Sequence, residues 1–352
     1  MHIGIDAHMV GENETGNETY IKTVLEGLAS LDQQHEITVF MQERHQLTSL
    51  PFEIDTFNHD GALRRNLLTY PRMLRKHDFD LFFATYVAPL LMPCPFVVAV
   101  HDISYVHFPE FFPRSVRLML STLVPFTIKR AAHVVTLSES AKQDMIDVYD
   151  VPEDKISVTY AAIQSHFRPL EDISRPDRPY ILAVGNLQPR KNLVRLITAY
   201  ARLREKNKIE HQLVIVGQDL WFADTIIGAA KSYQENILFT GYVSDDELVR
   251  LYNRADVFVY ASLYEGFGLP PIEAMACGTP VVTSNVSSLP EAVGDAALTV
   301  DPHDVDAIGD AILKILTDDK LRHDLRQKGF DRATLFTPEK LARRLLDVFE
   351  NV

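Results

Sequence analysis

Two glutamates, Glu265 and Glu273, are separated by seven residues that include the glycine- and proline-rich segment Gly266–Pro271. The two glycines of this segment let the backbone turn sharply and approach a ligand, and the two prolines can begin a helix. Loop amides and a helix N-terminus together form an anion site. Carboxylates beside such a site are useful if they accept hydrogen bonds from hydroxyls, as on a sugar and a ribose. The alternative is that Glu265 is a surface loop residue and Glu273 merely favours the helix dipole.

Two basic residues, Arg190 and Lys191, form a second candidate anion site. Arg190 and Lys191 follow the apolar run Tyr180–Val184 and precede a stretch of helical spacing, with Asn192 predicted to be its N-cap. Each charged hydrogen bond from such a pair to a pyrophosphate is worth roughly 1.5–3 kcal/mol. The alternative is a pair of solvated basic residues in a loop.

The first half of the chain offers weaker candidates. His101 follows the apolar run Phe96–Val100, where an imidazole can bind a sugar hydroxyl and shield a charged transition state. It could instead be satisfied by the local backbone. A loop containing Gly16 follows the first apolar run and precedes a helix, a weak signal because many nucleotide-binding units have one. Ser138 and Lys142 follow the apolar run His133–Leu137 and are further candidates for lining the cleft.

The elements that must position these residues follow from the apolar runs, which alternate with stretches of helical spacing. Runs without polar alternation indicate strands buried on both faces, as in parallel sheets. In the first half the runs are His2–Ile5, Ile37–Phe40, Leu81–Phe83, Phe96–Val100, His133–Leu137 and Ile156–Thr159. In the second half they are Tyr180–Val184, Leu213–Val216, Ile237–Phe239, Val257–Tyr260, Val281–Thr283 and Ala297–Val300. The sequence therefore predicts an α/β protein of two Rossmann-like, doubly wound parallel-sheet domains that face a cleft.

The segment Arg168–Pro179 is rich in proline and charge and interrupts the pattern. It predicts an N-terminal domain of residues 1–172 and a C-terminal domain of residues 173–335. Thr337 followed by Pro338 marks a helix start. We expect residues 336–352 to form a helix that packs back on the N-terminal domain.

The spacing of Glu265 and Glu273, the Gly-Phe-Gly-Leu-Pro loop between them, and Pro189-Arg190-Lys191-Asn192 resemble the family-4 retaining glycosyltransferases of the GT-B fold. The resemblance covers nearly the whole chain, and it implies that the N-terminal domain binds the acceptor and the C-terminal domain the nucleotide sugar. It implies that Glu273 holds the donor ribose, Glu265 the donor sugar, and the two cations the diphosphate. It further implies that His101 lies near the sugar ring. The donor-binding residues implied are Gly16, Gly185, Arg190, Lys191, Gly217, Tyr242, Val243, Glu265, Gly266, Phe267, Gly268, Leu269 and Glu273.

The same resemblance implies retention of anomeric configuration, with His101, Glu265, Arg190 and Lys191 as the catalytic residues. We expect no metal and no cofactor, because Arg190, Lys191 and a helix N-terminus can stabilise a leaving diphosphate. The segments Gly4–Ala7 and His107–Pro109 look like mannosyltransferases of polysaccharide assembly. They favour GDP-mannose as donor over UDP-glucose or another hexose donor. The alternatives are a sugar-nucleotide epimerase, a phosphorylase, or a non-catalytic nucleotide-sugar-binding subunit.

The composition and charge of the chain limit the kinds of partner that we expect it to bind. A formal net charge of -13 over 352 residues argues against nucleic acid as a partner. Two cysteines without metal-type spacing and the lack of a long apolar run suggest a cytoplasmic protein. The basic, leucine-containing segment Arg64–Lys76 could be a solvated helix face. It could also contact the inner membrane face peripherally, or a lipid-linked saccharide acceptor.

Overall fold

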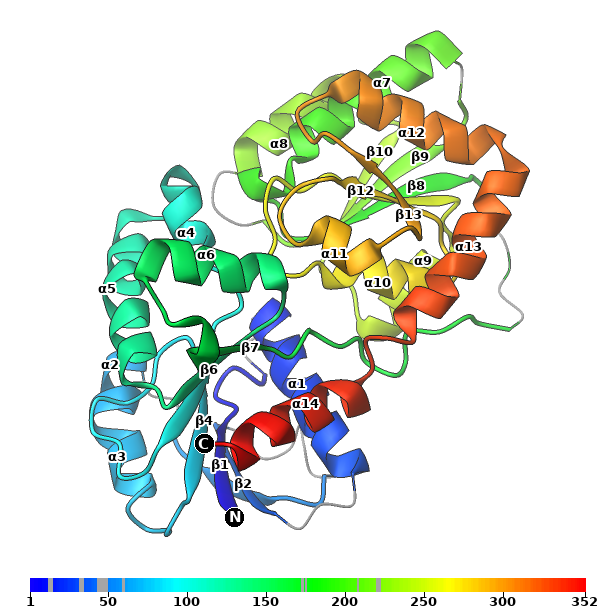
Figure 1. Ribbon diagram of the computed structural model, residues 1–352. Coiled ribbons are helices and arrows are strands. Elements are labelled where there is room, and N and C mark those ends of the chain that lie inside the picture. Colours follow the sequence, from blue (N-terminus) through cyan, green and yellow to red (C-terminus); the bar gives the residue numbers. More distant parts are fainter. Residues whose placement is uncertain are drawn as a thin grey trace. The chain divides into compact units, whose positions relative to one another are not determined.

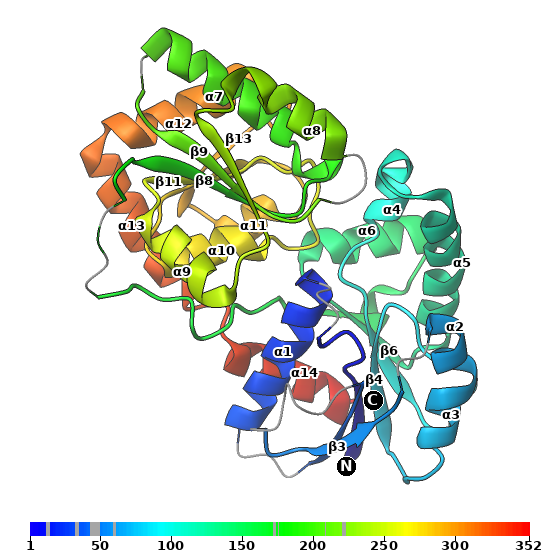
Figure 2. The same ribbon diagram turned by 180° about the vertical axis from the view of Figure 1, so that it is seen from behind.

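The computed structural model describes residues 1–11, 15–31, 35–42, 50–58, 61–171, 174, 176–207, 209–219 and 223–352 (Figures 1 and 2). The chain divides into two compact units. Unit 1 comprises Met1–Ile103, Leu118–Gln164 and Thr337–Val352, and unit 2 comprises Ser104–Arg117 and Ser165–Phe336. The boundary therefore lies eight residues before the one that the sequence suggested. The segment Ser104–Arg117 also belongs to unit 2, which the sequence did not suggest.

Within its described residues, unit 1 has a seven-stranded parallel sheet in the order β3-β2-β1-β4-β5-β6-β7. Its strands are β1 (His2–Asp6), β2 (Glu36–Met41), β3 (Glu53–Thr56), β4 (Leu81–Thr85), β5 (Phe96–Ala99), β6 (His133–Thr136) and β7 (Ile156–Val158). Its helices and helical turns are α1 (Thr15–Ser30), α2 (Ala62–Arg64), η2 (Arg65–Thr69), α3 (Tyr70–Met73), α5 (Arg114–Arg130, from Leu118 on), α6 (Glu139–Tyr149), η4 (Glu153–Lys155) and α14 (Pro338–Glu350). The sequence missed β3, whose residues Glu53-Ile54-Asp55-Thr56 alternate in polarity because the strand lies at an edge.

The C-terminal helix α14 lies against α1 in unit 1 (Figure 1). Thr337 caps it as predicted, its hydroxyl accepting a hydrogen bond from the amide of Lys340 at 3.4 Å. Gly27 of α1 makes the close approach possible, since a Cβ there would lie 2.0 Å from the carbonyl oxygen of Pro338. Phe349 reaches the sheet, with its ring centre 5.4 Å from that of Phe83 on β4.

Within its described residues, unit 2 has a six-stranded parallel sheet in the order β10-β9-β8-β11-β12-β13. Its strands are β8 (Tyr180–Val184), β9 (Gln212–Val216), β10 (Ile237–Gly241), β11 (Val257–Tyr260), β12 (Val281–Ser284) and β13 (Ala297–Val300). Its helices and turns are α4 (Ser104–His107), η3 (Pro109–Phe111), η5 (Pro189–Lys191), α7 (Leu193–Asn207), α8 (Ala223–Ala230), η6 (Lys231–Tyr233), α9 (Asp245–Arg254), α10 (Leu269–Ala276), α11 (Leu289–Val293), α12 (Val305–Thr317) and α13 (Asp319–Ala333).

Helices cover both faces of the second sheet. Helix α12 packs on α7 and helix α13 packs on α10, and the two pairs lie on opposite sides of the strands (Figures 1 and 2). Both sheets thus follow the doubly wound plan that the sequence predicted. In each, the strand order reverses once, next to β1 in unit 1 and next to β8 in unit 2. Ligands of such sheets bind beyond the carboxyl ends of the strands at this reversal.

Candidate donor site

The reversal in unit 2 lies between β8 and β11, which pair directly. The segment after β8 carries Arg190 and Lys191, and the segment after β11 carries Glu265. The two segments are joined through the backbone, because the amide of Leu263 donates to the carbonyl of Arg190 at 2.9 Å. The sequence-predicted cations and carboxylate therefore meet at the carboxyl edge of this sheet.

Glu265 forms ion pairs with both cations. Nη1 of Arg190 donates to Oε2 at 2.7 Å, and Nζ of Lys191 donates to Oε1 at 2.7 Å. Tyr260, the last residue of β11, donates its hydroxyl to Oε1 at 2.9 Å and accepts from Nζ of Lys191 at 2.5 Å. The cluster of two cations and one carboxylate carries a net positive charge, which suits an anionic ligand.

Burial by itself would raise the pKa of Glu265, whose residue is only 8% exposed. The charges of Arg190 and Lys191 outweigh that effect and lower the pKa to about 2. Glu265 is thus ionised at neutral pH. It fixes the positions of both cations, since each is bound to a different oxygen of the same carboxylate.

Two serines hold the loop around Glu265. The amide of Glu265 donates to Oγ of Ser287 at 3.0 Å. The hydroxyl of Ser288 bonds to the carbonyls of Glu265 at 2.8 Å and Phe267 at 3.0 Å. These bonds tie the glycine loop to the segment that follows β12, so its conformation is fixed from outside the loop.

Glu273 lies in a different environment. It is on α10, is 7% exposed, and its Oε2 accepts a hydrogen bond from the hydroxyl of Tyr252 on α9 at 2.9 Å. Across the described part of the chain, neither lysine nor arginine forms an ion pair with it. Burial, opposed by the Tyr252 bond and assisted by the nearby charge of Asp245, raises the pKa of Glu273 to about 7. A buried carboxylate without a cationic partner is suited to accepting hydrogen bonds from neutral hydroxyls.

Three glycines mark the carboxyl ends of β8, β9 and β10. Gly217 has a φ of +154°, and a Cβ there would lie 2.1 Å from the carbonyl oxygen of Gly185. Gly185 has a φ of +145°, and its Cβ would meet the aliphatic stem of Lys191 at 3.2 Å. The amide of Gly217 donates to the carbonyl of Gly241 at 3.1 Å. These positions bring three strand ends together and leave room for the Lys191 side chain.

The glycine loop enters α10 as the sequence suggested. Gly268 is the N-cap residue, with a φ of +104°, and Leu269 is the first residue of the helix. Gly266 and Phe267 are buried in front of it. Among the other implied donor residues, Tyr242 is 58% exposed after β10, and Val243 is half-buried.

The prediction that the Asn192 side chain caps α7 is wrong. Asn192 occupies the position before α7, but its backbone is left-handed with a φ of +58°, and its side chain does not cap the helix. Instead Nδ2 donates to the carbonyls of Ala261 at 2.9 Å and Pro302 at 2.7 Å, and Oδ1 accepts from Arg195 at 2.8 Å. Asn192 thus ties the cation-bearing turn to β11 and to the end of β13.

Comparison with known proteins now identifies the family. Glycosyl transferases group 1 matches residues 171–332, and Glycosyltransferase Family 4 matches residues 15–166. The O-antigen chain mannosyltransferase B of Escherichia coli is 36% identical over 266 residues, which cover 72% of this chain and 70% of that protein. The chain belongs to the group 1 glycosyltransferases.

A second relative of this glycosyltransferase is longer. The serotype-specific mannosyltransferase WbdA of Escherichia coli is 32% identical over 235 residues, which are 63% of this chain and 29% of that protein. Among solved structures, sucrose-phosphate synthase of Thermosynechococcus elongatus has a TM-score of 0.81 at 21% identity, covering 100% of this chain and 98% of the other. The fold is therefore GT-B, with two Rossmann-like units.

The first unit of this glycosyltransferase holds His101 and Gly16. His101 follows β5, is 6% exposed, and lies between the rings of Tyr20 and Tyr86, at centroid distances of 4.5 and 5.3 Å. Burial lowers its pKa to about 4, although Asp102 opposes the fall, so the ring is neutral at pH 7. Its buried Nε2 has no hydrogen-bond partner among the described residues.

The sequence suggested that Gly16 lies in a loop, but it lies in the first turn of α1, where it is exposed. A Cβ at Gly16 would meet nothing within 4 Å, so packing does not demand a glycine there.

Metal binding has two possible sources, and neither includes one of the implied donor residues. Aspartates with the Asp-x-Asp spacing of metal-dependent transferases occur at Asp78 with Asp80 and at Asp304 with Asp306. Asp80 accepts the amide of His2, and Asp304 caps α12. In the described ranges, one further group could offer three ligand atoms: His2, Glu36 and Glu53. These residues begin β1, β2 and β3 and so lie at the amino edge of the first sheet.

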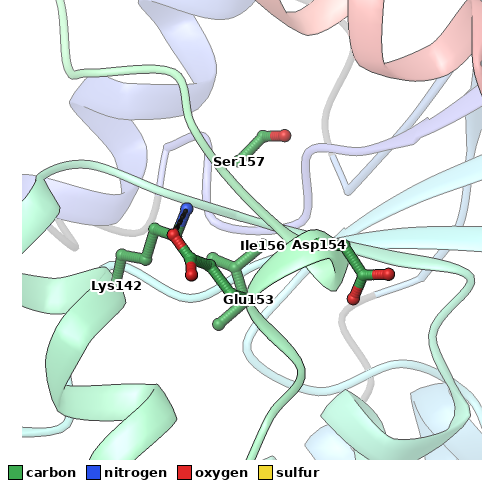
Figure 3. Close-up of a pocket in the computed structure, with 5 residues that line it drawn as sticks. All are labelled: Lys142, Glu153, Asp154, Ile156 and Ser157. Carbon is green, nitrogen blue, oxygen red and sulfur yellow. Dashed lines mark ion pairs between the residues drawn. The ribbon is translucent and has the colours of Figure 1, made fainter.

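A hollow in unit 1 is lined by Lys142, Glu153, Asp154, Ile156 and Ser157 (Figure 3). Nζ of Lys142 lies 3.5 Å from Oε1 of Glu153 there. Lys142 thus pairs with an acidic residue, and Ser138 serves as the N-cap of α6, accepting the amide of Ala141 at 3.0 Å. None of the implied donor residues lines this hollow, and we assign it no role.

The basic segment Arg64–Lys76 forms α2, η2 and α3. Leu67 and Leu68 are 38% and 47% exposed, and Arg64, Arg72, Arg75 and Lys76 are exposed as well. Arg65 differs, because it is buried. No helix in the described parts of the chain is both long and apolar enough to cross a membrane.

Sequence reasoning missed the tyrosines and serines of the donor site. Tyr260 ends a strand and was counted as part of its apolar run, and Tyr252 has the spacing of a core residue on its helix. Ser287 and Ser288 are 22 and 23 positions after Glu265, and no pattern in the sequence links them to it. Only the position of Tyr260, at the end of β11 and five positions before Glu265, was a usable signal.

Proposed function

We propose that this glycosyltransferase moves a mannosyl group from a nucleotide diphosphate sugar, with GDP-mannose as the favoured donor, to a saccharide or lipid-linked glycan. We further propose that it retains the anomeric configuration and needs no metal. The observation that carries the proposal is the cluster of Arg190, Lys191 and Glu265 at the strand reversal, with Glu273 nearby in sequence on α10. The names of both relatives as mannosyltransferases support the choice of sugar.

In this proposal each charged group has one task. Arg190 and Lys191 bind the diphosphate, and Glu265 holds both cations in place before the donor arrives. Its two carboxylate oxygens have about four lone-pair sites in all. Three of these accept from Arg190, Lys191 and Tyr260, and Ser262 supplies a further side-chain hydrogen bond, so a sugar hydroxyl binds Glu265 by replacing one of these donors. Glu273 accepts from the ribose hydroxyls, because among the described residues only Tyr252 donates a hydrogen bond to it.

The bond changes of the proposed reaction balance without a metal. The bond between the anomeric carbon and the leaving phosphate oxygen breaks while the acceptor oxygen bonds to the same carbon on the same face. The acceptor proton passes to the leaving phosphate. Lys191, Arg190 and the N-terminus of α10 stabilise the negative charge that develops on the diphosphate. His101, neutral at pH 7, offers its unpartnered Nε2 to the sugar without placing a second positive charge near the anomeric carbon.

The test uses the purified protein in EDTA with GDP-mannose, UDP-glucose, an ADP-sugar and a dTDP-sugar, each followed by proton NMR. Slow hydrolysis of GDP-mannose with release of GDP, and with the α-anomer of mannose formed first, is the expected result. Consumption of another donor would replace the favoured one. A requirement for added Mg²⁺ would contradict the metal-independent mechanism. Conversion of one nucleotide sugar into another without release of a diphosphate would indicate an epimerase, and binding without turnover would indicate a non-catalytic subunit.

The proposal includes peripheral membrane contact through the segment Arg64–Lys76. Leu67 and Leu68 offer apolar side chains to the interface, and Arg72, Arg75 and Lys76 offer positive charge to anionic lipid. Each such cation is worth about 1 kcal/mol near an anionic surface. A lipid-linked acceptor would place its saccharide at the same surface.

A further inference from the structure

The strand reversal in unit 1 is the counterpart of the donor position in unit 2, and it carries its own polar cluster. The reversal lies between β1 and β4, which pair directly. Asp6 is the last residue of β1, and His8 follows it by two positions. By the rule that located the cations and Glu265 in unit 2, a ligand of unit 1 should meet the residues that follow β1.

Asp6 is 1% exposed, and one of its oxygens collects three hydrogen bonds. Oδ1 accepts from the amide of His8 at 3.1 Å, from Nδ1 of His8 at 2.7 Å and from the hydroxyl of Tyr70 at 2.5 Å. Burial by itself would raise the pKa of Asp6, but the interactions with His8, Tyr70 and Arg65 outweigh it, and the pKa is lowered. Asp6 is therefore an ionised group that fixes the His8 ring.

The same bonds determine what His8 can offer. Because Nδ1 bonds to Asp6, Nε2 is the ring nitrogen that remains for a ligand. The structure records no partner for this nitrogen within the residues it describes, and the His8 side chain is 16% exposed. Its backbone is held too, since Nε2 of Gln42 donates to the carbonyl of His8 at 3.2 Å. Oε1 of Gln42 is a second acceptor at this edge that is buried and has no donor in the described ranges.

An unusual helical turn brings Tyr70 and Arg65 to Asp6. The segment Arg65–Thr69 is a π-helix, and the amide of Tyr70 bonds to the carbonyl of Arg65, five positions earlier. Pro71 follows directly and has no amide to continue the helical bonds. This wider turn places residues five apart on one face, so both side chains are buried on the Asp6 side. Short π-helical turns occur often at functional sites.

We propose that His8, held by Asp6, binds a hydroxyl of the saccharide acceptor through Nε2. The inference rests on the proposed glycosyl transfer and adds to it a residue that recognises the acceptor. A carboxylate needed only to end β1 would be satisfied by backbone amides, whereas Asp6 orients an imidazole whose other nitrogen is open. Saccharide hydroxyls suit this arrangement, because they donate to an acceptor nitrogen without requiring a charge.

The test compares His8→Asn with His8→Gln. Asparagine can keep the hydrogen bond to Asp6 through its amide but lacks a group at the position of Nε2, whereas glutamine reaches that position. The probe is octyl α-mannoside, whose binding is followed by ligand-observed NMR without any donor. We expect the dissociation constant to rise roughly tenfold in the asparagine variant, the effect of one lost hydrogen bond, and to recover in part in the glutamine variant. His303→Asn, at an exposed position in unit 2, is the control.

Donor hydrolysis without glycoside is measured on the same variants and should be unchanged, because water and not a saccharide is the acceptor in that reaction. Equal binding of the glycoside by wild type and His8→Asn would overturn the proposal, as would an absence of binding to the wild type. Loss of donor hydrolysis in a folded His8→Asn protein would also overturn it, since His8 would then act on the donor. Failure of the wild type to consume any donor would refute the proposed function instead, because glycoside binding is measured separately.

Discussion

Replacing Glu273 with glutamine removes a buried charge while keeping the shape of the side chain and an acceptor for the Tyr252 hydroxyl. In the folded protein the pKa of Glu273 is raised from an ordinary value of 4.5 to about 7, mainly by burial. Below about pH 4.5 both the folded and the unfolded states hold the proton. As the pH rises, the unfolded state releases it first, so stability falls until the pH passes about 7.

The size of this loss follows from the two pKa values. In wild type it amounts to about 3 kcal/mol above pH 7, of which somewhat more than 1 kcal/mol is already present at pH 5.5. The glutamine variant has no such loss. Its free energy of unfolding relative to wild type should therefore increase by about 2 kcal/mol between pH 5.5 and pH 8.5.

The assay is urea unfolding followed by far-ultraviolet circular dichroism on wild type and Glu273→Gln at both pH values. The matched control is Glu235→Gln, an exposed position of the same unit, where the difference from wild type should not depend on pH. A difference for Glu273→Gln that is constant across this range would refute the reasoning, since the carboxyl would then not be held protonated. The ionised carboxylate of Glu273 accepts hydrogen bonds from the donor's hydroxyls better than the protonated form does. We therefore expect the donor to bind more tightly as the pH rises through 7.

Four further predictions concern other residues of the protein. Lys191→Ala should reduce turnover in the NMR assay by at least about a hundredfold, as for loss of a group that stabilises the leaving charge, and full activity would remove the site assignment. Gly217→Ala should lower the free energy of unfolding by at least about 2 kcal/mol, because its Cβ would lie 2.1 Å from the carbonyl oxygen of Gly185. Gly16→Ala, where a Cβ meets nothing within 4 Å, should instead be neutral or stabilising by up to about 1 kcal/mol in the same measurement. Arg75→Glu should weaken flotation with phosphatidylserine vesicles, and unchanged flotation would exclude this segment as the membrane contact.

The strands and the cluster of Glu265, Arg190 and Lys191 could be placed from the sequence because their signals are local. Buried parallel strands are continuous apolar runs, and the cluster residues lie in the segments after them, Glu265 after β11 and Lys191 after β8. The glycine and proline residues around α10 specify its start by their own conformational limits. No distant contact is needed to recognise any of these features.

The features that were missed depend on contacts between distant parts of the chain. Tyr70 reaches Asp6 across 64 positions, and the π-helical turn that directs it has no reliable sequence signature. Asn192 bonds to Pro302 across 110 positions, and this contact outweighed its preference for capping a helix. The edge strand β3 alternates in polarity and is short, so its sequence resembles that of a loop.

The contact between α14 and α1 determines when unit 1 can complete its fold. Because translation proceeds from the N-terminus, α1 is made more than 300 positions before its partner helix is available. During that time Gly27 and the ring of Phe83 lack the residues that cover them, while Ser165–Phe336 of unit 2 are synthesised. A premature stop codon directly after Phe336 would therefore remove a helix that unit 1 needs and leave unit 2 with all of its own residues.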